Sequence, residues 1–175
     1  MDYPSGIGTP ESTVFYSGAE AVFERVKPVL LALGGNPVFV GVEVGHTSAL
    51  DIAGLTVALG TMFGILQGYT VCEAEGLPAD VFTQAVKGLQ PALDGILGQI
   101  SAKLQKKDYV GDEGTIEAWS AAHKELLEWS KDKGSDAGIA RAQQDLFKKA
   151  ISAGKGRADF AYLYDVLNEV LRKSY

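Results

Sequence analysis

Cysteine, histidine and basic residues are all scarce in this sequence, and each shortage excludes a class of protein. Cys72 is the single cysteine among 175 residues, so no disulfide can form within the chain. It lies in an apolar run, where a thiol is typical of a buried packing residue rather than of a nucleophile. The two histidines, His46 and His123, lack the spacing of a helical metal-binding motif, so we expect no metal site.

The charge balance of the chain is acidic. Lysine and arginine total 16 against 22 aspartates and glutamates, which gives a net charge of -6. Because nucleic acid is bound by a basic face, we exclude it as a partner. A content of 46% hydrophobic and 22% charged residues is typical of a globular domain. The first residues show no basic and then apolar leader, and we predict a cytoplasmic protein.

The first part of the chain predicts a small β-α-β passage over residues 12–41. Strand-like runs occupy 13–16 and 36–41, and residues 19–34 between them carry apolar side chains at helical spacing. Pro28 lies inside this helix and is expected to kink or shorten it. Two strands do not make a stable sheet by themselves, so we expect these to be the edge of a larger sheet.

The rest of the chain is helical in its pattern. Each stretch shows apolar residues at helical spacing or a long apolar run, and several are bounded by capping residues or glycine. The predicted helices occupy residues 46–75, 78–107, 112–134, 135–154 and 158–175. The sequence therefore predicts a mainly α protein with a small β-α-β beginning.

The helix predicted over 46–75 is long and apolar enough to span a bilayer. Its glycines at 60, 64 and 68 form a stripe that is typical of closely packed membrane helices. Against this, its flanks are acidic, and no lysine or arginine lies between Lys27 and Lys87 to anchor it at a membrane surface. We therefore favour a helix buried in a water-soluble protein. A helix of this length needs more covering than the chain offers, so we expect an interlocked homodimer.

Asp51 is the one charged residue between Glu43 and Glu73. Near the start of a helix, a carboxylate stabilises the positive end of the helix dipole. An alternative is a catalytic acid whose pKa is tuned by apolar surroundings. Side chains on or near the same helix face either line a hydrophobic pocket beside it or are simply core: Leu55, Leu59, Met62 and Phe63.

A succession of short segments resembles the C-terminal part of imine reductases and reductive aminases, within the β-hydroxyacid dehydrogenase (6-phosphogluconate dehydrogenase-like) superfamily. These segments are DYPSGIG, FYSG, VKPVLLALGG, VGHTSALDIAG, EGLPADVF and GDEGTIEAWSAAHKELLEWSKDKGSDAG, in this order along nearly the whole chain. The resemblance implies an N-terminal Rossmann domain that binds NADPH, a long interdomain helix, and a helical domain that interlocks with a second copy. It also implies hydride transfer from NADPH to a cyclic imine, or to an iminium formed from a ketone and an amine.

The Rossmann half implied by the resemblance is missing from this sequence. The pair Gly6 and Gly8 has Glu11 where a dinucleotide fingerprint has its third glycine, and no strand precedes it. The segment instead resembles the family's loop near the nicotinamide, which makes Pro4, Ser5 and Gly6 candidate cofactor contacts. We expect residues 1–42 to be the remnant of the NADP-binding domain and 43–175 to be the helical dimerisation and substrate-pocket domain. Alone, this chain is expected to be inactive and not to bind NADPH.

The resemblance also bears on Asp51, which matches a position where many imine reductases carry an aspartate. Hydroxyacid dehydrogenases of the superfamily carry a lysine near the start of this helix instead. A carboxylate suits an iminium cation, or donates a proton to the product amine. The sequence differs from reductive aminases at two positions. Leu59 stands where a tyrosine is common in that family, and Ala92 lies where a tryptophan is common.

Trp119, Ala122 and His123 fall where the helical domain would reach the partner's site, and with the four residues near Asp51 they complete the predicted substrate pocket. A core role for Trp119 and a plain helix-face role for His123 remain open. Two alternative functions are also open, namely a non-catalytic helical homodimerisation module and a β-hydroxyacid dehydrogenase-like protein with another substrate.

Overall fold

The computed structural model describes residues 8–112 and 114–169. The chain divides into two compact units, Met1–Glu75 and Gly76–Tyr175. The predicted mainly helical fold with a small parallel pair of strands is confirmed. The candidate cofactor contacts Pro4, Ser5 and Gly6 lie outside the described residues.

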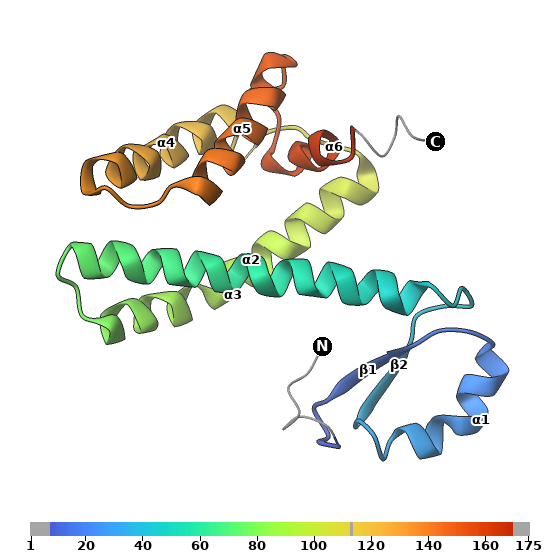
Figure 1. Cartoon of the computed structure of the whole chain (residues 1–175). Coiled ribbons are helices and arrows are strands. Elements are labelled where there is room, and N and C mark those ends of the chain that lie inside the picture. The colour runs from blue at the N-terminus through green and yellow to red at the C-terminus, as the bar shows by residue number, and fades with distance from the viewer. Residues whose placement is uncertain (1–7, 113, 170–175) are drawn as a thin grey trace. The chain divides into compact units, whose positions relative to one another are not determined.

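The first unit begins with the predicted β-α-β passage (Figure 1). Strands β1 (Thr13–Tyr16) and β2 (Asn36–Phe39) pair in parallel, joined by helix α1 (Glu20–Leu30). Parallel neighbours need such a crossover, because the end of the first strand and the start of the second lie at opposite ends of the pair. Phe23 anchors the helix to both strands, with ring centroids 5.9 Å from Tyr16 and 5.2 Å from Phe39.

Helix α1 is shorter than the sequence predicted. It runs through Pro28 and ends at Leu30, where turns with bonds from Ala32 N to Val29 O and from Leu33 N to Leu30 O replace the helix. The chain then turns back to β2 through Gly34 and Gly35. A side chain at Gly35 would overlap the backbone of Pro10, so this close approach requires glycine.

Helix α2 (His46–Ala74) runs without interruption through the apolar stretch. Its apolar residues are spread around all sides, and none of its residues, all of which the structure describes, is buried. No atom of the described residues lies within 4 Å of a carbon added at Gly54, Gly60 or Gly64, apart from the helix's own neighbouring backbone. The expectation of a buried helix is therefore not met within one copy, because its apolar surface exceeds what the chain covers. By length and composition alone, α2 also qualifies as a membrane span, which is weak evidence for a single helix.

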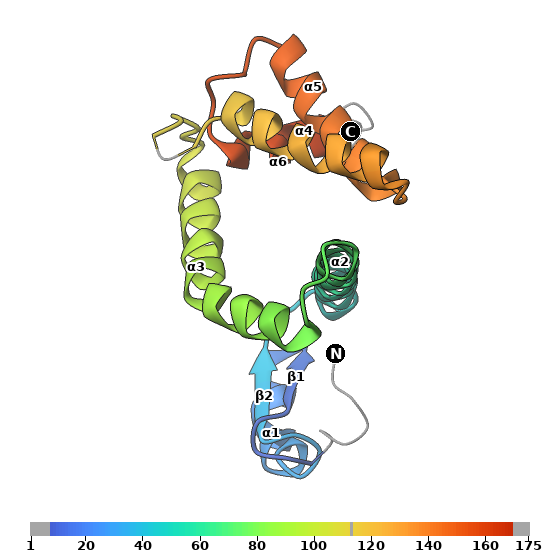
Figure 2. The same ribbon diagram turned by 90° about the vertical axis from the view of Figure 1, so that its left-hand side faces the viewer.

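The second unit begins with helix α3 (Ala79–Lys106), which directly follows Pro78 and carries Asp80 in its first turn. Pro91 lies inside the helix, and Figure 2 shows α3 curving between its two ends. An internal proline bends a helix because it removes one backbone hydrogen bond and crowds the preceding turn.

The remaining helices pack into one cluster: α4 (Ile116–Lys133), α5 (Gly138–Ser152), the 3₁₀ turn η2 (Phe160–Tyr162) and α6 (Leu163–Leu167) (Figure 2). Their shared core consists of Ile116, Phe147, Ala150 and Leu163. Thr115 caps α4 by accepting a hydrogen bond from the Ala118 amide, and Gly134 ends it in the left-handed conformation. Over the described residues, the last predicted helix is replaced by η2 and the short α6.

Candidate functional site

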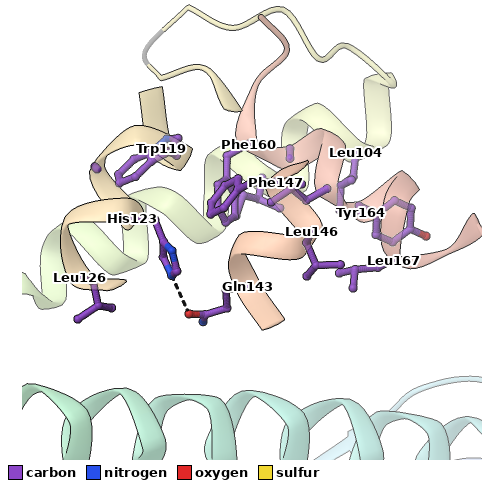
Figure 3. Close-up of a pocket in the computed structure, with 14 residues that line it drawn as sticks. Leu104, Trp119, His123, Leu126, Gln143, Leu146, Phe147, Phe160, Tyr164 and Leu167 are labelled. Atoms are coloured by element: carbon purple, nitrogen blue, oxygen red, sulfur yellow. Dashed lines mark hydrogen bonds between the residues drawn. The ribbon is translucent and has the colours of Figure 1, made fainter. Parts of the chain in front are cut away.

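An apolar groove of about 640 Å³ lies among the helices of the second unit (Figure 3). Side chains from α3, α4, α5, η2 and α6 form it, so it draws on residues far apart in the sequence. Its carbon-rich lining consists of Ile100, Leu104, Trp119, Ala122, Leu126, Leu146, Phe147, Phe160, Ala161, Leu163 and Leu167. His123, Gln143 and Tyr164 add the polar groups. A groove of this composition binds an apolar partner or ligand through burial of hydrophobic surface.

Three aromatic rings form one wall of the groove. Phe160 lies edge-on to both Trp119 and Phe147, with centroid distances of 6.1 and 6.0 Å. The Trp119 side chain is nevertheless 50% exposed and that of Phe160 is 40% exposed. The wall is therefore internally packed but leaves a large aromatic surface open in a single copy.

Lys103 fixes the segment that carries Phe160. Its ammonium group donates to the Val110 carbonyl at 2.9 Å and to Asp112 at 3.0 Å, and lies 3.5 Å from Asp159. The hydrogen bond to Asp112 raises the pKa of Lys103, and Asp159 adds to this effect. Asp159 in turn accepts a hydrogen bond from the Ala161 amide at 2.9 Å and so starts η2. This network ties the end of α3 to the aromatic wall.

His123 is the centre of a polar cluster on the α4–α5 side of the groove. Its Nδ1 lies 3.0 Å from Oε1 of Gln144, and its Nε2 lies 3.1 Å from Oε1 of Gln143, the contact drawn in Figure 3. Gln144 is buried and donates to the Ser120 hydroxyl at 2.8 Å. The buried pair fixes the ring of His123, which also lies 5.7 Å from the ring of Phe147.

The structure brings three of the predicted pocket residues together, because Trp119, Ala122 and His123 all line this groove. Sequence reasoning missed Gln143 and Gln144, which hold the histidine. The sequence did contain an indication of Gln144. Its spacing from Ala140 and Phe147 places it on the buried face of α5, where a polar side chain needs a hydrogen-bond partner.

Asp51 lies in a different hollow, which belongs to the first unit. Strand β1 and the first turns of α2 contribute most of this hollow. Its lining is mixed, with the hydroxyl residues Ser12, Thr13, Thr47 and Ser48 and the apolar residues Val14, Phe15, Leu33, Leu50 and Ile52. Asp51 makes no hydrogen bond or ion pair within the described part of the chain, and the same part holds no cluster of metal ligands. An exposed carboxylate that no cation of the described residues neutralises suits a cationic ligand.

The other predicted pocket residues do not line the Asp51 hollow. Leu55, Leu59, Met62 and Phe63 follow it along α2 and are between 41% and 52% exposed. Their role as pocket residues therefore stays a prediction, as does the catalytic role of Asp51. In one copy, these side chains form an open apolar surface rather than an enclosed site.

Comparison with known proteins places these features in context. Residues 43–169 match the family described as NADPH-dependent reductive aminase-like, C-terminal domain. An NADPH-dependent reductive aminase from Aspergillus oryzae is 22% identical over 169 residues, which cover 94% of this chain and 57% of that protein.

Solved structures give the same picture. An imine reductase from Myxococcus stipitatus in complex with NADP+ is 35% identical, with a TM-score of 0.89, over 95% of this chain and 59% of that one. A reductive aminase from Aspergillus terreus, in complex with NADPH4, cyclohexanone and allyl amine, is 25% identical with a TM-score of 0.86, over 95% of this chain and 58% of that one. This chain thus spans less than two thirds of the length of these relatives.

Proposed function

The chain belongs to the NADPH-dependent reductive aminase-like family through its C-terminal domain, and from this we propose that it is the dimerising, substrate-pocket half of an imine reductase-like oxidoreductase. In the intact enzyme, NADPH would supply a hydride to the carbon of a C=N bond. The observation that carries the proposal is the match of the whole helical domain, together with a groove whose wall holds Trp119, Ala122 and His123.

The described residues do not fit an NADPH site. They contain no glycine-rich turn between a strand and a helix of the kind that binds a dinucleotide. Strand β1 has β2 as its one neighbour in the described sheet, and its other edge is open. We propose that residues 1–42 complete the NADP-binding sheet of the intact enzyme, with Pro4, Ser5 and Gly6 near the cofactor. The chain alone would then be inactive.

A homodimer would cover the two apolar surfaces that one copy leaves open. Helix α2 is apolar on all sides, and the glycines along it leave room for a close neighbour. The groove of the second unit has a matching apolar lining. We propose that α2 of one copy lies in the groove of the other, which gives an interlocked, domain-swapped homodimer. A water-soluble, cytoplasmic protein follows from this proposal, since α2 then needs no membrane.

Asp51 would act on the substrate nitrogen. Hydride addition to an iminium carbon neutralises the cation, and addition to a neutral imine requires a proton at nitrogen. A carboxylate stabilises the iminium cation, and a protonated carboxyl group donates the proton that a neutral imine needs. Its exposed position in a hollow of mixed apolar and hydroxyl lining leaves room for a small imine, or for a ketone and an amine.

A chimaera tests the proposal. The nucleotide-binding half of the Myxococcus stipitatus imine reductase, joined ahead of residue 43, supplies the part of that relative that this sequence does not cover. We expect the chimaera to oxidise NADPH in the presence of a cyclic imine, and the chain alone neither to bind NADPH nor to react.

The alternative, a non-catalytic dimerisation module, is favoured by one observation. Leu59 and Ala92 replace the tyrosine and tryptophan that are common in reductive aminases. This alternative predicts that the chimaera binds NADPH and dimerises but reduces none of a panel of cyclic imines or ketone–amine pairs. A β-hydroxyacid dehydrogenase-like activity would instead appear as NADP+ reduction with a hydroxy acid.

A further inference from the structure

Imidazole is the side chain that gains a proton in mild acid, and His123 is the one described residue lining the groove that carries it. The other lining groups are apolar, amide or phenol. We propose that protonation of His123 weakens self-association of this chain, so that the groove opens in mild acid and closes over a second copy near neutral pH. The inference rests on the proposed homodimer, in which α2 of a second copy covers the groove.

The hydrogen-bond partners of His123 can satisfy both ring nitrogens whether the imidazole is neutral or protonated. Amide oxygens of Gln144 and Gln143 face both ring nitrogens, at 3.0 and 3.1 Å, which suits a charged ring that donates twice. A neutral ring donates once and accepts once. A half-turn of the Gln143 amide, whose nitrogen has no other partner among the described residues, supplies the donor. Protonation is therefore possible without rearranging the fold.

The two sides of the ring differ in their access to water. Gln144 and Ser120, on the Nδ1 side, are 2% and 3% exposed. Gln143, on the Nε2 side, is exposed at the groove. Water can hydrate a charged ring through the Nε2 side while the groove is open, and that hydration is lost when an apolar helix covers the groove.

No described carboxylate lines the groove to compensate a charged ring. On α5, the charged Arg141 and Asp145 are paired with Asp136 at 3.6 Å and Lys148 at 2.9 Å. The other elements around the groove contribute carbon side chains, apart from the hydroxyl of Tyr164 on α6. On α4 itself, the charged neighbours of His123 in sequence, Lys124 and Glu125, are exposed and are not among the lining residues.

The composition of α2, the helix proposed to cover the groove, determines whether acid weakens or strengthens self-association. Asp51 is the one charged residue of α2 before Glu73, so residues 52–72 are uncharged. Removing water from a charged imidazole beneath such a surface costs more than covering a neutral one. Proton binding therefore favours the open groove, and self-association weakens as the pH falls.

Sedimentation equilibrium of the full chain tests this. At about pH 7.5 we expect a dimer, and at about pH 5.5 a dissociation constant raised tenfold or more, since one covered charge per groove is enough for a factor of about ten. His123→Gln keeps a hydrogen-bonding side chain without the titration. This variant should dimerise equally at both pH values.

His46→Gln is the matched control, because His46 is the other of the two histidines in the chain and lies outside the groove. It should keep the full response to pH. Circular dichroism at both pH values checks that the helices persist, so that a loss of association is not a loss of fold.

Three results would overturn the inference, and they are distinguishable. A monomer at both pH values overturns the proposed homodimer and the pH dependence with it. A dimer with the same dissociation constant at both pH values overturns the pH dependence alone. A tighter dimer in acid also overturns it, and would indicate that Asp51 of the second copy lies against His123.

Discussion

At the scale of single residues, Ser130 is a polar group that the fold does not satisfy. It is fully buried near the end of α4, and its hydroxyl has no hydrogen-bond partner among the described residues. Such a group costs roughly 1–3 kcal/mol of stability. We expect Ser130→Ala to leave the free energy of unfolding unchanged or raise it by about 1 kcal/mol, as measured by urea unfolding at fixed protein concentration.

Ser120→Ala is the matched control, since this serine is also buried in α4 but accepts a hydrogen bond from Gln144. Its loss leaves a buried amide donor without a partner and should lower the free energy of unfolding by about 1–3 kcal/mol. Equal losses in the two variants would mean that the Ser130 hydroxyl has a partner in solution.

Asp51 carries the prediction for catalysis. In the chimaera with a nucleotide-binding half, Asp51→Asn keeps the size of the side chain but removes its charge and its proton-donating capacity. We expect kcat for imine reduction to fall by a factor of about 10² to 10³, with dimerisation unchanged. Asp132→Asn, an exposed change near the end of α4, should leave kcat as it was. An unchanged rate in Asp51→Asn would remove this residue from the mechanism.

Sequence alone predicted some of these residues for definite reasons. Asp51 stood out because it interrupts an apolar run, whereas Trp119 and His123 were predicted from the resemblance to imine reductases. Gln144 was missed, although its spacing from Ala140 and Phe147 places it on the buried face of α5. The bond from Gln144 to His123 joins residues 21 apart, and no local pattern encodes it.

At the scale of elements, the Lys103 network holds α3, the 108–115 loop and η2 together. Lys103→Met removes the charge that Asp112 and Asp159 share, so we expect a lower free energy of unfolding near neutral pH. The raised pKa of Lys103 gives the sign of the pH dependence. The stabilisation is complete below the ordinary lysine pKa of about 10.4 and is lost as the pH rises through the higher value in the fold.

Urea unfolding near neutral pH and at about pH 11 measures this effect. The difference between the natural chain and Lys103→Met should be present at the lower pH and shrink at the higher one. Lys106→Met, three residues along the same helix, is the control and should make little difference at either pH. A difference that persists undiminished in alkali would argue for lost packing rather than a lost charge.

Element boundaries were predictable where local signals are strong. The apolar run predicted a helix over residues 46–75, and α2 is His46–Ala74. Gly134 predicted the end of α4, whose last residue is Lys133. The single helix predicted over residues 158–175 was wrong over the described residues, because Asp159 caps the 3₁₀ turn η2. Asp159 also pairs with Lys103, which lies 56 positions earlier in the chain. Helical periodicity in the sequence contains no information about such a distant partner.

At the scale of the whole molecule, the glycines of α2 test the proposed assembly. A Cβ atom added at Gly64 meets no atom of the described residues within 4 Å, apart from the helix's own neighbouring backbone, so we expect the Gly64→Leu chain to fold. Circular dichroism checks this. If another helix packs closely there, the larger side chain should raise the dissociation constant of the dimer about 100-fold or more. Sedimentation equilibrium measures this change.

Gly64→Ala serves as the graded control. Alanine favours a helix over glycine by roughly 1 kcal/mol, so any weakening must come from packing rather than from the helix itself. We expect a smaller effect than that of leucine. Equal association of the natural chain and both variants would place the glycine stripe outside the interface.

The groove was beyond prediction at this scale. Its lining comes from five elements, and only the packing of α4 on α5 and η2 brings them together. The sequence did support two expectations at this scale. A pair of strands too small for a stable sheet predicts further strands beside it, and a helix apolar on all sides predicts a second copy that covers it. Both stay predictions.

The apolar surface of α2 has a consequence for how the protein is made. In a single copy this helix is exposed, and it has the length and composition of a bilayer-spanning segment. On the proposed assembly, each newly synthesised chain is in a race between pairing, capture by chaperones or the insertion machinery, and aggregation. Pairing is second order in the concentration of chains, whereas capture by a chaperone or the insertion machinery is first order in it. Aggregation also rises with concentration, so the yield of folded protein should be greatest at an intermediate density of ribosomes translating the same message.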